Sequence, residues 1–185
     1  MSISEFNLAQ HQRAARKLLI TVAEWEDENG SITVTKGTST VKVNREILGR
    51  RTEDSSIEYN PDINTSTDIL GINYTDINKT QPQQDFDPYL ILGGSKLGAK
   101  LNDIRKRNAV TEYNQFTLYI ITAYIGDSSN GYEAERHENC TITINSLGGD
   151  SNVNMPISAY FSNESTTGLV DKLSDDFTYQ TDVAV

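Results

Sequence analysis

The sequence predicts a mainly β protein, an antiparallel β-sandwich or barrel of about seven or eight strands. One α-helix, at about 96–107, is expected on its flank, and a long polar hairpin is expected at about 55–80. Three observations support this class. Segments rich in β-branched and aromatic residues are joined mostly by short turns of Gly, Asn and Asp. Only one segment has a helical period. Asn, Thr, Ser, Asp and Tyr are abundant while hydrophobic residues make up only 36%, which favours strands and turns over helices.

The length and charge set further limits. A chain of 185 residues suits one domain with a hydrophobic core. We expect an N-terminal arm at 1–16, a β domain at 17–161 and a polar C-terminal segment at 162–185. The N-terminal arm is either frayed or docked on a neighbouring subunit. No apolar run is long enough to span a bilayer, and a net charge of −10 disfavours binding to anionic membranes or non-specific binding to nucleic acid.

The first expected strands form a meander. Residues 18–26 begin apolar on both faces, which predicts a buried strand. Asn29-Gly30 tolerates the positive φ of a tight turn, and residues 31–35 return as the partner strand. Residues 40–48 alternate again and predict a third strand.

The stretch 58–88 is polar and acidic, with Lys79 as its single cation. Within it, residues 68–77 are expected to form a strand in which alternate side chains from Leu70 to Asp76 share one face. The hairpin built from this stretch has one polar side and is suited to presenting a surface.

The second half contains the expected helix and three or four more strands. Ser95 is a suitable N-cap, and Leu97, Leu101 and Ile104 form an apolar stripe at helical spacing. A central strand is expected at 116–125, and an alternating strand at 140–145 with Cys140, Ile142 and Ile144 inward. A strand at 153–161 contains Pro156, which indicates an edge or a bulge, and residues 177–179 are a possible short strand.

No catalytic or metal-binding constellation is found. His137 and Cys140 supply only half of a zinc site, and Cys140 is better explained as a small core residue. Gly93-Gly94-Ser95-Lys96 lacks the spacing of a phosphate-binding loop. We therefore expect no catalytic residue, no cofactor and no metal, and a protein that is not an enzyme. Carboxylate pairs without apolar walls are present at Glu53/Asp54, Asp85/Asp87 and Asp175/Asp176.

Arg50 and Arg51 precede Glu53 and Asp54. Local surface pairing is one interpretation of these four charges, and a contact with a neighbouring subunit is the other.

Several segments, in order, resemble the tail tube (major tail) proteins of long-tailed bacteriophages and prophages. The resemblance covers roughly residues 15–161. It is carried by 15–20, by the hairpin segments 49–59 and 67–71, by Phe86-Asp87-Pro88 before the helix 96–107, and by 138–144 with Gly148-Gly149-Asp150.

Membership of that family implies a structural virion protein made in the bacterial host cytoplasm. Its members are β-sandwiches that form hexameric rings, which stack into a hollow tube through which double-stranded DNA passes without specific binding. The implied partners are further copies of the chain, the tape measure protein, and tail terminator or tail tip proteins. An acidic lumen would repel phosphates and leave DNA free to slide.

The resemblance also assigns residues to surfaces. Glu58, Asp62, Asp68 and Asp76 are expected at the lumen or at ring–ring contacts. The cations of the helix are expected at a subunit interface: Lys96, Lys100, Arg105, Lys106 and Arg107.

Two other functions fit the same sequence. The first is a tube protein of a contractile injection or type VI-like secretion system. The second is a carbohydrate- or receptor-binding β-sandwich of a virion surface, with Trp25, Tyr124 and Tyr132 as its candidate aromatics.

Overall fold

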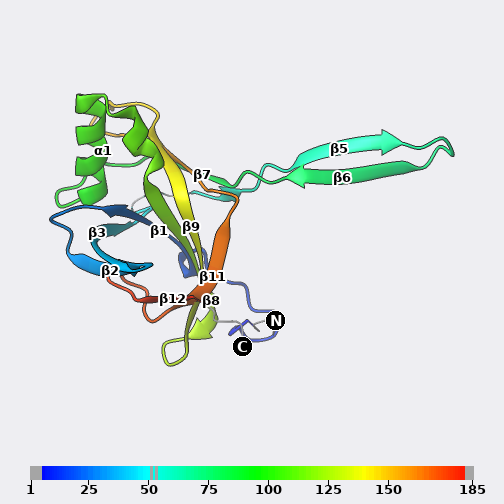
Figure 1. The fold of residues 1–185 in the computed structure, drawn as a ribbon, viewed down its shortest axis with the longest axis horizontal. Helices are drawn as coiled ribbons and strands as arrows, with labels where there is room; N and C mark the ends of the chain where they lie inside the picture. The colour runs from blue at the N-terminus through cyan, green and yellow to red at the C-terminus, as the bar shows by residue number, and fades with distance from the viewer. Residues whose placement is uncertain (1–5, 51, 53, 182–185) are drawn as a thin grey trace.

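The computed structural model describes residues 6–50, 52 and 54–181, and these residues contain twelve strands and one α-helix (Figure 1). Ten strands form one antiparallel sheet in the order β2-β3-β1-β8-β9-β10-β7-β4, with β11 also beside β9 and β12 beside β11. Strands β5 and β6 form a separate two-stranded sheet. The strands are β1 Leu19–Glu26, β2 Ile32–Lys36, β3 Ser39–Ile47, β4 Ile57–Glu58, β5 Asp62–Thr67, β6 Asn73–Lys79, β7 Gln83–Phe86, β8 Phe116–Asp127, β9 Gly131–Ile144, β10 Ile157–Tyr160, β11 Ser165–Val170 and β12 Tyr179–Thr181.

The predicted class, mainly β and antiparallel with one flanking helix, is confirmed. The helix α1 spans Lys96–Arg107, and two short 3-10 helices lie at Arg16–Leu18 and Val110–Asn114. The expected seven or eight strands become twelve because the prediction missed short strands such as β4 and β11. α1 is the longest described helix, and no described helix is long and apolar enough to cross a bilayer.

The two central strands, β1 and β8, are buried on both faces. Val22 faces one cluster of buried side chains, and its neighbour Ala23 faces another. The larger cluster contains the apolar stripe of α1, formed by Leu97, Leu101 and Ile104. These three side chains are fully buried, so packing against the sheet, rather than intrinsic propensity alone, holds the helix in place. The sequence pattern predicted both features.

The N-terminus of α1 is capped by two polar side chains, those of Ser95 and Glu46. Ser95 Oγ accepts a hydrogen bond from the Gly98 amide at 3.0 Å, as an N-cap should. Glu46 Oε2 accepts from the Leu97 amide at 3.0 Å, and the Ser95 hydroxyl donates to Glu46 Oε1 at 2.8 Å. A carboxylate of β3 therefore occupies the positive end of the helix, and no free anion is needed there.

The sheet branches at β9. Residues 132–137 pair with β11 on the side away from β8, whereas residues 141–144 pair with β10. Asn139, at φ 56, lies between the two partners, and the register with β8 shifts nearby. The sequence predicted this strand only from Cys140 onward, because Glu133, Glu135 and other charged residues hide the alternation of its first half.

Two predicted features were wrong. The strand expected at 68–77 begins only at Asn73, since Asp68 to Gly71 form the turn between β5 and β6. Pro156 does not mark an edge strand, because β10 is hydrogen-bonded to β9 on one side and β7 on the other. Pro156 lies just before the strand, where its missing N–H removes no ladder bond.

Both ends of the described chain contact the sheet. Phe6 bridges to Ile125, and its ring lies 5.6 Å from that of Tyr124 in an edge-to-face arrangement. The C-terminal segment, for which one short strand at 177–179 was considered, supplies β11 and, at Tyr179–Thr181, β12. Residues 1–5 of the expected N-terminal arm and residues 182–185 lie outside the described residues.

Candidate assembly surfaces

The hairpin formed by β5 and β6 projects from the body of the protein (Figure 1). We call this two-stranded unit, residues 62–79, the projecting hairpin. Its two strands are hydrogen-bonded only to each other, and every residue of both is exposed. The six residues of β5 and the seven of β6 each correspond to about 20 Å of extended chain. A two-stranded ribbon without a layer of its own to cover it is only marginally stable in water.

The register gives the projecting hairpin two different faces. Ile63 lies opposite Ile77, and these two side chains are 55% and 63% exposed. Because side chains alternate across a strand, the pair Asn64 and Asp76 points to the other face. Tyr74 shares this second face with Asp76. One face therefore carries the two isoleucines among threonines, and the other, which we call the acidic face, carries Asp76 among uncharged polar side chains.

The tip of the projecting hairpin is organised by Asp68. Its Oδ1 accepts from the amides of Leu70 at 2.8 Å and Ile72 at 2.9 Å, and its Oδ2 accepts from the Tyr74 hydroxyl at 3.1 Å. The backbone donors, with Ile72 the strongest, lower the pKa of Asp68. Gly71 supplies the positive φ of 78° that the turn requires. Asp68 thus satisfies two backbone amides and a hydroxyl of the tip, while the side chains of Leu70 and Ile72 remain exposed.

The hairpin is rooted in the large sheet through β4. The Gln81 amide donates to the Tyr59 carbonyl at 2.9 Å, and β4 then pairs with β7. Glu58 lies in β4 at this root and not on the projecting hairpin. The structure therefore places three of the four predicted acidic residues, Asp62, Asp68 and Asp76, on the exposed hairpin, and separates Glu58 from them. Whether they face a lumen stays a prediction.

Three of the five predicted interface cations are engaged within the chain. Lys96 Nζ donates to Ser31 Oγ at 3.1 Å, and Lys100 Nζ lies 2.7 Å from a carboxylate oxygen of Glu112. Arg107 forms ion pairs at 2.7 Å with both Glu112 and Asp103. These cations fasten the helix to its own surroundings.

Arg105 and Lys106 are different. The guanidinium of Arg105 donates to the neutral Asn102 side chain at 2.9 Å, and both cations are exposed. Neither contacts a carboxylate among the described residues. Val110, directly after the helix, is also exposed. The C-terminal end of α1 thus combines unpaired positive charge with an apolar side chain.

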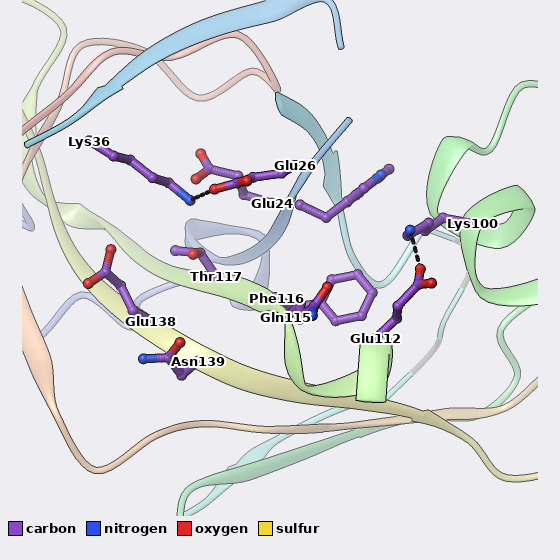
Figure 2. A pocket seen from close by; sticks show the side chains of 11 residues that line it. Glu24, Glu26, Lys36, Lys100, Glu112, Gln115, Phe116, Thr117, Glu138 and Asn139 are labelled. Atoms are coloured by element: carbon purple, nitrogen blue, oxygen red, sulfur yellow. Dashed lines mark hydrogen bonds and ion pairs between the residues drawn. The ribbon is translucent and has the colours of Figure 1, made fainter. Parts of the chain in front are cut away.

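A polar cavity of about 380 Å³ lies beside the ends of β1 and β8 (Figure 2). Two ion pairs lie in its wall, Lys36 with Glu26 and Lys100 with Glu112. Hydrogen bonds from Arg107 and then Lys100 lower the pKa of Glu112 to about 2. A general acid needs a raised pKa, so Glu112 is poorly suited to that role. The lining residues are Glu24, Trp25, Glu26, Lys36, Lys100, Glu112, Gln115, Phe116, Thr117, Glu138 and Asn139.

The weaker candidates of the sequence are accounted for by packing. Cys140 is buried, as predicted, and burial raises the pKa of its thiol. Its Sγ donates to the His137 carbonyl, while the His137 ring contacts the Ser162 carbonyl at 2.9 Å. Among the described residues, no three His, Cys, Asp or Glu side chains could hold a metal ion together. Trp25, a candidate for sugar stacking, is 3% exposed and belongs to the core.

Arg50 lies 3.5 Å from Asp175 rather than beside Asp54. Among the described residues Arg50 therefore pairs with the C-terminal segment and not with Asp54, while the contact with a neighbouring subunit stays a prediction. Arg51 and Glu53 lie outside the described residues.

The apolar pair Ile63 and Ile77 was not recognised in the sequence. It became visible only once the turn was placed at 68–71, because the turn determines which residues of the two strands are opposite. The available signal was Asp68 followed by Gly71, a spacing typical of a tight turn closed by an Asp side chain.

The fold and surfaces define a mainly β protein with an exposed, two-faced hairpin. No protein-family model and no curated protein matches its sequence. Among solved structures, it is similar to the tube-terminating cap of an anti-feeding prophage, determined by cryo-electron microscopy. The identity is 12%, the similarity covers 91% of this chain and 99% of that chain, and the TM-score is 0.45. A similarity of this size decides nothing about function.

Proposed function

We propose that this chain is a structural subunit that associates with further copies of itself through the projecting hairpin. One observation carries the proposal. The hairpin exposes Ile63 and Ile77 on one face, leaves both outer strand edges unpaired, and is covered by no described element of its own chain. Unpaired edges and exposed apolar side chains are costly for a monomer and useful to a protein that assembles.

The magnitudes favour repeated contacts. Fully burying an Ile or Leu side chain stabilises by about 1.5–3 kcal/mol. The projecting hairpin and its tip expose five such side chains, while association costs about 4–15 kcal/mol. One hairpin contact is therefore weak by itself, whereas several contacts per subunit give cooperative assembly. The five side chains are Ile63, Ile69, Leu70, Ile72 and Ile77.

The specific assembly we propose is the tail tube of a long-tailed bacteriophage or prophage, with hexameric rings stacked into a hollow tube in the virion. The resemblance described above supports this, and so does the charge. A net charge of −10 is suited to a wall that repels DNA phosphates. On this proposal the chain has a non-enzymatic role, and its partners are other tail proteins such as a tape measure or terminator protein.

A tube protein of a contractile injection or type VI-like system would use the same hairpin contacts and differ in its cargo. An acidic lumen favours DNA, so the charge of the channel wall in an assembled tube separates the two. The carbohydrate-binding alternative is weakened because Trp25 is buried.

Negative-stain microscopy and sedimentation velocity over a range of concentrations test the proposal. The wild-type protein should form rings or tubes with a central channel. The double variant Ile63→Ser/Ile77→Ser should stay folded and shift toward the monomer. Leu147→Ser/Val153→Ser is the matched control, because it removes two exposed apolar side chains outside the hairpin and should assemble normally. A wild-type protein that stays monomeric at all concentrations would contradict the proposal.

A further inference from the structure

The acidic face of the projecting hairpin has no positive partner among the residues that the structure describes. Asp76 makes no ion pair or side-chain hydrogen bond among the described residues, and it shares this face with Tyr74. The only cation of the hairpin, Lys79, lies near its root, where it is paired in register with Asp62. A surface that docks here should therefore carry positive charge.

Such a surface exists on the opposite side of the body. In Figure 1 the projecting hairpin extends to one side and α1 lies on the other. The C-terminal end of α1 holds Arg105 and Lys106, which are exposed and without carboxylate partners in the described part of the chain. The neighbouring Val110 is 61% exposed, and Leu70 and Ile72 at the tip of the hairpin are exposed apolar side chains as well.

We propose that the acidic face of the projecting hairpin of one copy docks on the Arg105–Lys106 end of α1 in the next copy. This rests on the proposed function and names the two surfaces that meet. The projecting hairpin and the C-terminal end of α1 are different surfaces on opposite sides of one copy, so the contact between copies is heterologous. Each docked copy still presents a free hairpin or a free helix end, and the association extends or closes into a ring.

A second group of cations is less suitable. Arg13 and Lys17 are exposed in the N-terminal segment, but Arg16 between them donates from Nε to the Ser55 carbonyl at 3.1 Å. Ser55 lies just before β4, where the projecting hairpin is rooted. This second group of cations therefore lies close to the base of the projecting hairpin of its own chain. Repeated docking in one direction needs a positive surface on the opposite side of the molecule.

Charge reversal at one residue of each surface tests the pairing. We choose Asp76→Lys and Lys106→Glu, because both positions are exposed and neither shapes the turn as Asp68 does. Like charges brought together at an interface should raise the concentration for half-assembly about tenfold or more in each single variant. An equimolar mixture of the two should assemble as the wild type does, since each hairpin in an alternating arrangement then meets an opposite charge.

Lys42→Glu is the control, because it makes the same charge change at an exposed cation outside both surfaces and should leave assembly unchanged. Thermal unfolding of every variant confirms that the monomer is intact. If Asp76→Lys weakens assembly but Lys106→Glu does not, or if the mixture fails to recover, the hairpin docks elsewhere and the inference is overturned while hairpin-mediated assembly stands. A wild-type protein that never associates would instead overturn the proposed function.

Discussion

Arg45 Nε donates to Glu24 Oε2 at 2.7 Å in the interior of the protein, where the two side chains are 2% and 1% exposed. The two residues are register partners on β3 and β1. The guanidinium also donates to the Phe177 carbonyl and lies 4.1 Å from the centre of that ring. The Tyr119 hydroxyl adds a hydrogen bond to Glu24 at 3.2 Å. One polar group therefore ties two central strands, a third strand and the C-terminal segment together.

Removing either charge should destabilise the fold strongly. In Arg45→Met the Glu24 carboxylate is left buried without its cation, which typically costs about 3–5 kcal/mol. The double variant Glu24→Leu/Arg45→Met should lose less than Arg45→Met, because no uncompensated charge remains. Urea unfolding measures both free energies.

Lys36→Met is the matched control for that experiment. It breaks the pair of Lys36 with Glu26, whose side chains are 30% and 59% exposed, and the cost should be about 1 kcal/mol or less. Equal losses for Arg45→Met and Lys36→Met would show that the buried pair is not a special determinant of the fold.

The N-cap of α1 supports a second prediction. Ser95→Ala removes the acceptor of the Gly98 amide and a donor to Glu46, and should lower the free energy of unfolding by about 1 kcal/mol. Ser151→Ala replaces an exposed serine outside the helix and should change it little. Far-UV circular dichroism during urea unfolding reads the difference, and an unchanged Ser95→Ala protein would mean that Glu46 caps the helix alone.

Acid should weaken the attachment of α1 through Glu112. Its pKa falls from 4.5 to about 2 in the folded protein, so its contribution is present above the unfolded value and is lost as the pH falls toward 2. Glu112→Gln should lower the melting temperature by about 2 °C at pH 6 and have little effect below pH 2, where the carboxyl is protonated in the folded protein too. A difference that stays constant with pH would show that packing of the side chain, not its charge, is responsible.

What could be predicted from the sequence depends on whether the signal is local. α1 was found because Ser95 and the apolar stripe behind it lie within one short segment. The start of β6 was missed because the exposed residues of the tip continue an alternating pattern through the turn. The buried pair of Glu24 and Arg45 joins positions 21 residues apart, and only the register of β1 and β3 brings them together.

The same reasoning applies to the candidate surfaces. The acidic residues Asp62 and Asp76 could be placed on an exposed hairpin because polarity and turn residues are visible in the sequence. The five cations of α1 could not be sorted, because the partners of Lys100 and Arg107 come from a later segment that contains Glu112. Composition shows how many charges a helix carries, but only the folded chain shows which of them are already paired.

Amide hydrogen exchange gives the last prediction, and it concerns the projecting hairpin directly. In the monomer β5 and β6 do not pack on the hydrophobic core. Their amides should therefore exchange through a local opening that costs far less free energy than global unfolding. The amides of β8, which is hydrogen-bonded on both sides and buried, should exchange only on global unfolding.

Assembly should change this contrast in one region. If a second copy covers the projecting hairpin, the amides of residues 62–79 should exchange about tenfold more slowly, or slower still. The reason is that each 1.4 kcal/mol by which the contact stabilises the closed hairpin lowers the population of the open form about tenfold. The amides of β8 serve as the internal control and should gain little. Hairpin amides that exchange equally fast in the monomer and in assembled particles would show that another surface holds the copies together.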